Sequence, residues 1–515
     1  MDKCGQREKY LISIILLSLA HITTQYVTNE YDKDKINFLE EESALTLGGQ
    51  ITLTEAETLA NYKLMKLKYA ELDQGFENSY NFNFSKHYFE YQHLINESEV
   101  YQIIRKMPKG AALHVHSSMM LGADYIMELT YEDNLYICYE NDTIKLLFSD
   151  DVPQKPCIVD WELLSDVRNA TSDIELFDAN LKEHFTIFTE DQELMSADVN
   201  AVWKRFDKMY YTLRPLLGYR PIREKYFFKA LKTFYEDNIM YVEIRSGLHM
   251  LYDLNGTIDD PLALARVYDR VAKKFTEEHP DFIGVKLIYT QHRTKNLNKI
   301  RESIEFAKKL KVEMPDLFAG LDLVGQEDLG NPLSDYLPVL SKARDEFDFF
   351  LHAGETNWFG TPSDENLIDA ILLGSKRLGH AFALIKHPAL MQVVKDRDIA
   401  LEVNVLSNVV LALVRDVRNH PVATYLAKGL PVVLSSDDPG AWGADPLSHD
   451  FYVTFVGAAS KRADLRTLKQ LALNSLQYSA MDDSKKTEAL ELFKIKWNKF
   501  IQDLMIRRCS QLGVI

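Results

Sequence analysis

Histidines and acidic residues are concentrated in four short segments of the chain: LHVH at 113–116, LHAGE at 351–355, LGHAF at 378–382 and SSDDP at 435–439. Because side chains two apart on a strand point to the same side, His114 and His116 can bind one ion. His352 and Asp437 would complete a set of three imidazoles and one carboxylate that leaves room for a water. A divalent ion lowers the pKa of such a water to about 7. Zinc suits these ligands, and iron, cobalt and manganese remain alternatives.

Two further residues of these segments could carry protons. Glu355 lies three residues after His352, past an Ala-Gly turn, so it can face the same cavity without binding the ion. A carboxylic acid there could protonate a ring nitrogen of a substrate while hydroxide attacks the neighbouring carbon. His380 could orient the water, take its proton and stabilise the developing oxyanion. Asp438 directly follows Asp437 and could bond a second ring nitrogen.

The elements that position these residues follow an alternating pattern. Strands are predicted over 111–116, 239–245, 283–290, 317–324, 348–353, 376–380, 400–406 and 431–436, and helical patterns lie between most of them, for example at 365–375, 388–397 and 420–428. Eight strands with intervening helices predict an α/β fold, a (β/α)8 TIM barrel, with a site at the carboxyl ends of its strands. The four segments follow the first, fifth, sixth and eighth strands. A doubly wound sheet is the alternative.

Two regions interrupt or precede the repeat, so the barrel is predicted over 108–126 and 187–515. The stretch 127–186 carries strand-like runs around two cysteines and predicts a small inserted domain with the disulfide Cys138–Cys157. Residues 26–107 look mainly helical, and Thr54 with Glu57 forms a capping-box pattern. This extension could mediate dimerisation, or it could be a packing element without an oligomeric role.

The amino terminus indicates export from the cell. Basic residues before residue 10 and an apolar run over 11–20 predict a signal peptide at 1–25, with a buried helix or an uncleaved anchor as the alternative. No later stretch is long and apolar enough to span a membrane. After cleavage Cys509 would be left over, either free or paired between chains. Sequons for N-glycosylation agree modestly with secretion: Asn83, Asn96, Asn141, Asn169 and Asn255.

The charge of the chain limits its partners. The formal net charge is −17 over 515 residues. A nucleic-acid backbone is therefore not expected as the main partner, because binding phosphates needs a basic surface. A small molecule is the expected substrate.

Longer motifs around the four segments resemble a known group. MPKGAALHVH, LHAGETNW, KRLGHAFAL and VVLSSDDPGAWG are similar to the adenosine deaminase branch of the amidohydrolase superfamily, and most similar to the secreted adenosine deaminase-related growth factors. MYVEIR at 240–245, IYTQHR at 288–293, FAGLDLVGQED at 318–328 and LVRDVRNHP at 413–421 extend the resemblance over nearly the whole chain.

The resemblance implies a reaction and a set of roles. The reaction is hydrolytic deamination of adenosine or 2′-deoxyadenosine to the inosine product and ammonia, which lowers extracellular adenosine and regulates cell growth. The implied roles are one zinc on His114, His116, His352 and Asp437, proton donation by Glu355, proton acceptance by His380, and substrate contacts from Trp203, His292, Gly325 and Asp438. The resemblance also implies a homodimer and an inserted domain that contacts a receptor or glycosaminoglycans. From spacing alone, Trp203 would be interpreted as helix packing.

Three residues depart from the pattern of this group. Its members place an aspartate after the HxH motif, where it binds a ribose hydroxyl; here Ser117 stands there. A neutral partner is worth about 1 kcal/mol against roughly 1.5–3 for a charged one, so nucleoside affinity should be about ten-fold lower. Ala381 replaces a glycine, and Gln326 replaces a histidine. These departures keep two alternatives open: a growth-factor-like binding protein acting through the inserted domain, and an amidohydrolase for adenine, AMP or a modified nucleoside.

Overall fold

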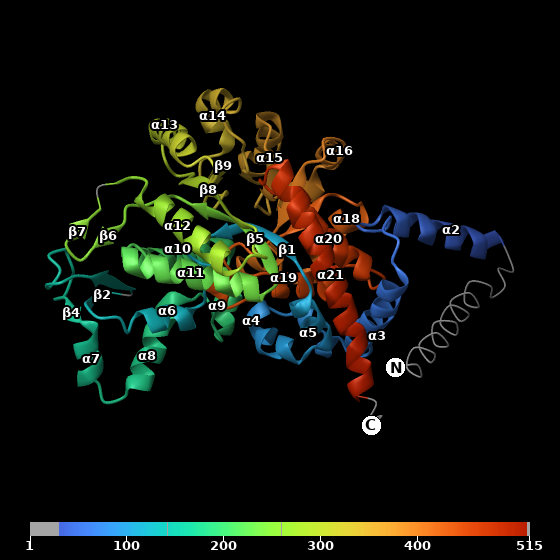
Figure 1. Cartoon of the computed structure of the whole chain (residues 1–515), viewed down its shortest axis with the longest axis horizontal. Helices are drawn as coiled ribbons and strands as arrows, with labels where there is room; N and C mark the ends of the chain where they lie inside the picture. The colour runs from blue at the N-terminus through green and yellow to red at the C-terminus, as the bar shows by residue number, and fades with distance from the viewer. Residues whose placement is uncertain (1–29, 142, 259, 512–515) are drawn as a thin grey trace.

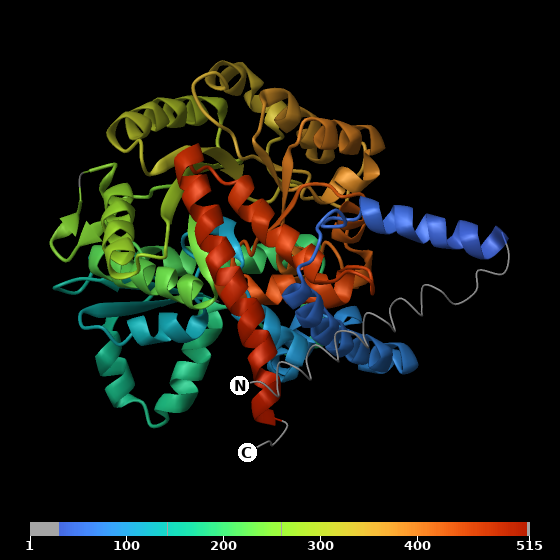
Figure 2. The same cartoon turned by 45° about the vertical axis from the view of Figure 1, so that its right-hand side comes forward.

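The computed structural model describes residues 30–141, 143–258 and 260–511. The signal peptide predicted at 1–25 lies outside these residues. An α/β body carries a helical extension at its amino-terminal end and a small inserted domain on the opposite side (Figures 1 and 2). No helix within the described ranges has the length and apolarity needed to cross a membrane.

The body is built on eight parallel strands. They are β1 (Gly110–His116), β5 (Ile239–Ser246), β8 (Gly284–His292), β9 (Phe318–Val324), β10 (His352–Ala353), β11 (Arg377–His380), β12 (Ala400–Val403) and β13 (Val432–Leu434). They form two four-stranded sheets whose strands follow chain order. Single bridges join the sheets at both ends, Leu321 with Phe349 and Val115 with Asp437. The strands therefore close into a barrel, and the doubly wound alternative is wrong, because such a sheet has two open edges.

Helices surround the strands, as the alternating pattern predicts (Figure 1). The helices between and after the strands are α11 (Arg220–Glu236), α12 (Ala263–Glu278), α13 (Leu297–Glu313), α14 (Leu337–Ala343), α15 (Pro362–Leu373), α16 (Pro388–Asp396), α17 (Val405–Val410), α18 (Val422–Ala427), α19 (Ser448–Tyr452), α20 (Leu465–Gln477) and α21 (Asp483–Gln511). The strands are buried on both faces, as is typical of parallel sheets covered by helices.

The fifth barrel strand is shorter than the predicted range 348–353. Two N–H groups of this stretch bind side chains: the Leu351 N–H donates to Ser375 Oγ at 3.0 Å and the His352 N–H to Asp322 Oδ1 at 2.8 Å. A regular ladder is therefore limited to β10. The backbone at His352 is thus held by the side chains of Asp322 and Ser375.

The amino-terminal extension is helical, as predicted. It contains α2 (Glu30–Leu45), α3 (Glu55–Glu77), α4 (Tyr88–Tyr91) and α5 (Glu99–Lys106). The predicted capping box of Thr54 and Glu57 opens α3. Glu57 also accepts hydrogen bonds from Trp497 Nε1 at 2.8 Å and Lys469 Nζ at 2.5 Å, which fasten α3 to α21 and α20. In contrast, α2 stands away from the body in both views (Figure 2).

A buried lysine ties α3 to the segment 460–463. Lys68 Nζ donates to the carbonyl oxygens of Ser460 at 2.9 Å and Ala463 at 2.8 Å and lies 3.9 Å from the centre of the Phe455 ring. Burial lowers the pKa of Lys68 from 10.5 to about 7. Between these two values the unfolded chain holds a proton that the folded chain has lost.

This lysine should make stability depend on pH. The unfolded state binds more protons than the folded state between pH 7 and 10.5. The contribution of Lys68 to the free energy of unfolding therefore rises by about 1.4 kcal/mol per pH unit across this range, and it is lost again as the pH falls. Lys68→Met should remove this slope, measured by urea unfolding at several pH values in that window. Lys66→Met, on the exposed side of α3, is the matched control. Equal slopes for Lys68→Met and the unmodified protein would contradict the prediction.

The inserted domain after β1 has the disulfide and strands that were predicted. It contains α6 (Ala123–Leu129), β2 (Leu135–Glu140), β3 (Thr143–Phe148), β4 (Glu162–Leu163), α7 (Leu164–Ala170) and α8 (Ile174–Lys182). Its antiparallel sheet has the order β3-β2-β4, and Cys138 is bonded to Cys157. The chain returns to the barrel through α9 (Gln192–Met195) and α10 (Val199–Leu216).

Candidate metal centre and active site

The four predicted ligands meet at the carboxyl end of the barrel. One side-chain atom from each of His114, His116, His352 and Asp437 lies within 4.8 Å of those of the others. Asp437 Oδ1 is 3.5 Å from His114 Nε2 and 3.2 Å from His116 Nε2. The ligands come from β1, β10 and the loop after β13, which are brought together only by closure of the barrel.

The donor set fits a divalent cation. His114 Nε2 and Asp437 Oδ1 are buried and have no hydrogen-bond partner among the described residues, a costly state that a bound cation relieves. Burial lowers the pKa of His116, and that of His352 to about 4, so both rings are neutral, as metal ligands must be. Although burial alone raises the pKa of Asp437, its close contacts with the His114 and His116 rings bring that pKa well below its usual range. Three imidazoles and one carboxylate are ligands that suit zinc.

Each of the two innermost histidines is held by a carboxylate. His352 Nδ1 lies 2.6 Å from Asp322 Oδ2, and His114 Nδ1 lies 2.7 Å from Glu402 Oε2. These contacts occupy Nδ1 and leave Nε2 of each ring for the ion. Sequence reasoning missed both carboxylates. Each of them is a charged residue within an otherwise apolar strand. This pattern could have indicated a buried partner, because a buried charge needs one.

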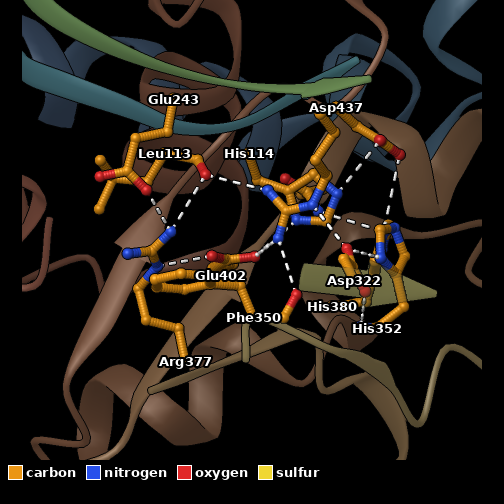
Figure 3. Close-up of polar contacts among 12 residues, drawn as sticks. Leu113, His114, Glu243, Asp322, Phe350, His352, Arg377, His380, Glu402 and Asp437 are labelled. Atoms are coloured by element: carbon orange, nitrogen blue, oxygen red, sulfur yellow. Dashed lines mark hydrogen bonds and ion pairs between the residues drawn. The ribbon is translucent and has the colours of Figure 1, made fainter. Parts of the chain in front are cut away.

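Buried arginines link the supporting carboxylates (Figure 3). Arg245 donates from Nε to Asp322 at 2.7 Å and from Nη2 to Glu402 at 2.6 Å. Arg377 contacts the other oxygen of Glu402 and Glu243 Oε2, both at 2.6 Å. Burial raises the pKa of Glu402, but the guanidinium groups of Arg245 and Arg377 outweigh this and hold it well below its usual range. The chain of alternating charges therefore joins two ligand histidines to each other.

Replacing the bridging arginine should loosen the ion. Arg245→Lys keeps the charge but loses the fork that reaches both carboxylates, so zinc affinity should fall about 10- to 100-fold. The measurement is zinc transfer to a chromogenic chelator. Arg168→Lys is the control, because Arg168 is a buried arginine of the inserted domain whose guanidinium group also binds two residues, Thr130 and Asp178. Equal zinc affinity in both variants would refute the role of Arg245.

The predicted acid faces the same cavity. Glu355 is buried, and burial, followed by the charges of Asp437 and Glu327, raises its pKa well above the usual range. Its carboxyl is therefore a proton donor at neutral pH. Glu327 also accepts the N–H groups of Glu355 at 2.9 Å and Gly354 at 3.1 Å, which fixes the turn after β10. Sequence reasoning missed this anchor.

His380 lies between the acid and the ligand carboxylate. Its Nδ1 is 3.1 Å from Glu355 Oε1, without the alignment of a hydrogen bond, and its Nε2 is 3.7 Å from Asp437 Oδ2. Figure 3 shows His380 next to His352 and Asp437, and the centres of the two histidine rings are 5.1 Å apart. Burial lowers the pKa of His380 well below its usual range, so the ring is neutral.

The backbone is strained at three residues of the site. His380, Ala381 and Asp437 have φ angles of +61°, +47° and +58°. Such left-handed conformations in residues other than glycine cluster at functional sites, where the surrounding structure holds them. Ala381, which stands where the resembling group has glycine, therefore adopts a conformation that glycine would take without strain.

The predicted substrate residues lie at or just after the carboxyl ends of β8, β9 and β13, and on α10. Gly325 follows β9 with φ +98°, and a Cβ there would come within 2.4 Å of His292 Nε2, so the two residues are adjacent and only glycine fits. Asp438 is buried beside Asp437, and its Oδ1 has no partner among the described residues. Trp203 is half-buried on α10, edge-on to Phe206.

Ser117 and Gln326 make bonds of their own. The Ser117 hydroxyl accepts a hydrogen bond from the Tyr268 hydroxyl at 2.9 Å, and the Ser117 N–H donates to the Arg245 carbonyl at 3.0 Å. The hydrogen of the serine hydroxyl remains available as a donor. Gln326 Nε2 donates to Asn200 Oδ1 at 2.7 Å, which connects the loop after β9 to the start of α10.

Comparison with known proteins places this site in a family. A model described as adenosine deaminase matches residues 180–495, and one described as adenosine/AMP deaminase N-terminal matches 11–104. The chain is 42% identical over 507 residues to adenosine deaminase 2 of Homo sapiens, covering 97% of this chain and 99% of that protein. It is also 42% identical over 480 residues to adenosine deaminase 2 of Pongo abelii, covering 92% and 94%. A cog1816 amidohydrolase from Burkholderia ambifaria with bound Zn shares the fold with a TM-score of 0.56 at 18% identity, covering 79% and 95%.

Proposed function

The chain belongs to the adenosine deaminase family, and we propose that it is a secreted, zinc-dependent enzyme that hydrolyses adenosine and 2′-deoxyadenosine to the inosine products and ammonia. One observation carries the proposal. A buried acid, a neutral histidine and a ligand set for one cation adjoin one another at the carboxyl end of the barrel. Hydrolytic deamination of a purine needs these three components at a single carbon atom.

His114, His116, His352 and Asp437 would hold the zinc ion. When bound, the ion acts as a Lewis acid and makes water nucleophilic at neutral pH. The bonds from Asp322 and Glu402 to two of the imidazoles keep the ligand atoms in place.

The remaining residues of the site move protons and orient the purine. Glu355 gives its proton to a ring nitrogen, which makes the adjacent carbon electrophilic. Water adds to that carbon, one of its protons passes to the leaving amine and the other returns to Glu355, and the exocyclic C–N bond breaks to release ammonia. Asp438 binds a second ring nitrogen, and His380 stabilises charge on the oxygen that adds.

The sugar would be bound at the rim of the cavity. Ser117 would donate its free hydroxyl hydrogen to a ribose oxygen, and Trp203, His292 and Gly325 would contact the nucleoside. The direct test compares inosine or ammonia release from adenosine, 2′-deoxyadenosine, adenine and AMP. The two nucleosides should react and AMP should be poor, because the motifs carry no cluster of basic side chains for a phosphate. Turnover of adenine or AMP alone would overturn the nucleoside assignment.

Secretion and glycosylation are further parts of the proposal. The basic and apolar pattern at the amino terminus supports a cleaved signal peptide, and the disulfide of the inserted domain supports an oxidising compartment. Four sequon asparagines are exposed, namely Asn96, Asn141, Asn169 and Asn255, whereas Asn83 is half-buried. Expression in a secreting cell should therefore give a protein in the medium that shifts in mass on enzymatic removal of N-glycans.

The two appended regions are proposed to bind protein partners. Exposed Tyr31, Phe38 and Leu45 on α2, which stands away from the body, support a homodimer formed through the extension. The inserted domain has fourteen acidic and four basic residues over 127–186. This balance supports a basic receptor surface rather than an anionic glycosaminoglycan.

Binding without turnover is the second candidate for the effect on cell growth. Exposed Ile158, Val159 and Ile174 on the acidic inserted domain favour it. Glu355→Gln separates the two candidates in a growth assay. If growth regulation works through extracellular adenosine, the variant should lose the effect; a retained effect would assign it to the inserted domain.

A further inference from the structure

For one buried histidine outside the metal centre, the neighbouring groups determine which ring nitrogen carries the hydrogen. His420 follows η7 (Val417–Asn419) and is 2% exposed. Its Nδ1 lies 3.0 Å from the N–H of Val422. Because a backbone N–H can only donate, Nδ1 is an acceptor without a hydrogen. Burial lowers the pKa of His420 to about 3, which agrees with a neutral ring. The single ring hydrogen of His420 is therefore on Nε2.

The next group in the chain of bonds is an amide. His420 Nε2 lies 3.0 Å from Asn408 Oδ1, so it donates to that oxygen. This bond fixes which way the amide faces, and the amide nitrogen is turned toward His380, at 3.2 Å from its Nδ1. Because an amide N–H also only donates, His380 Nδ1 must accept. The hydrogen of the neutral His380 ring is then on Nε2, the nitrogen that faces Asp437.

A second amide fits this order once its nitrogen and oxygen are exchanged. Asn404 Nδ2 lies 3.3 Å from His380 Nε2, and Asn404 Oδ1 is buried without a partner among the described residues. With the Asn404 amide turned by 180°, Oδ1 accepts the hydrogen of His380 Nε2 and is no longer orphaned. Asn404 directly precedes α17, and Asn408 lies one helical turn later, within it. The same turn carries Ser407, whose hydroxyl donates to Asp437 Oδ2 at 2.8 Å.

We propose that Asn408 and His420 are positioning residues that hold His380 in the tautomer with hydrogen on Nε2. In this tautomer His380 donates a hydrogen bond from Nε2 to the oxygen that adds to the purine. It does not accept a proton at that atom, in contrast to the acceptor role that the family resemblance implies. The inference rests on the proposed deaminase function for its kinetic consequence, but the tautomer itself does not depend on any substrate.

The decisive variant is Asn408→Asp, which keeps the shape of the side chain. A carboxylate accepts from His420 Nε2 and would also require a hydrogen on His380 Nδ1, which leaves Nε2 as a lone pair. Losing one preorganised donor to an oxyanion lowers kcat by roughly 100- to 1000-fold. We expect a loss of this size for adenosine, with KM changed by no more than a few-fold and the zinc content unchanged. A kcat equal to that of the unmodified protein would overturn the proposal.

Two substitutions of His420 distinguish the effect of its hydrogen bond to Asn408 from the effect of its packing. In His420→Gln an amide N–H replaces the Nε2 hydrogen and can still donate to Asn408 Oδ1, so kcat should stay within a few-fold. His420→Leu removes the donor and should lose kcat toward the level of Asn408→Asp. Equal losses in both variants would show that His420 acts only by packing, and would overturn the proposal.

A spectroscopic readout tests the tautomer without turnover. In protein labelled with ¹⁵N-histidine, the shifts of the ring nitrogens report which one carries the hydrogen. His380 should show hydrogen on Nε2, identified by loss of its signals in His380→Gln, and Asn408→Asp should move that hydrogen to Nδ1. If His380 carries hydrogen on Nδ1 in the unmodified protein, the proposal fails even if the protein deaminates adenosine. If the tautomer is as inferred but adenosine does not react, only the proposed function fails.

Discussion

Replacing Glu355 with glutamine is expected to lower kcat for adenosine by about 100- to 10,000-fold, the range that general acid catalysis contributes. The glutamine amide has the size of the carboxyl group but has no acidic proton to give to a ring nitrogen. The backbone at residue 355 should not move, because its N–H is held by Glu327 at 2.9 Å. The metal ligands are also untouched, so zinc should remain bound at one ion per chain.

A matched glutamate elsewhere controls for the substitution itself. Glu365 is exposed on α15, and Glu365→Gln should leave kcat and KM unchanged. The rates are followed by the fall in ultraviolet absorbance as adenosine becomes inosine. If Glu355→Gln retained more than about a tenth of the original kcat with its zinc bound, another group would have to supply the proton.

Replacing Asp437 with asparagine is expected to remove both zinc and activity. Asp437 supplies the only negative charge among the four ligands, and His114 and His116 converge on its Oδ1. An asparagine has nearly the same shape but no charge to offset that of the cation. Because even residues that support a ligand are worth about 10- to 100-fold in affinity, loss of the carboxylate ligand should exceed 100-fold. Zinc content after desalting, by elemental analysis, is the measurement.

The neighbouring aspartate gives the control for that substitution. Asp438 is equally buried and is proposed to bind the purine rather than the ion. Asp438→Asn should keep one zinc per chain and raise KM by roughly 10- to 100-fold, the value of one charge-assisted hydrogen bond. Loss of zinc from Asp438→Asn with retention in Asp437→Asn would reverse the two assignments.

Much of the architecture could be predicted because it depends on local patterns. Alternating apolar runs and helical stretches marked the barrel, and Thr54 with Glu57 marked the start of α3. The HxH motif was readable because both histidines lie on one strand. His352 and Asp437 could be added because each follows a strand whose carboxyl end faces the same cavity. Cys138 and Cys157 are only 19 residues apart, so their pairing was also a local inference.

The supporting groups could not be predicted because their partners are distant in the chain. Arg245 joins Asp322 and Glu402, which are separated from it by 77 and 157 residues. A charged residue in an apolar strand indicates that a partner exists, but the closed barrel determines which residue it is. The chain of bonds from His420 through Asn408 to His380 is similar, since it depends on the direction in which one short helix faces. The late start of β10 has the same origin, because distant side chains bind the N–H groups of Leu351 and His352.

The most direct test of the account is a zinc titration of the metal-free protein with adenosine as substrate. The protein is stripped with a chelator, zinc is added in steps, and inosine formation is measured at each step. The account predicts no turnover without metal and a linear rise that stops at one zinc ion per chain. Full turnover by the metal-free protein, or zinc bound at one ion per chain without any inosine, would contradict it.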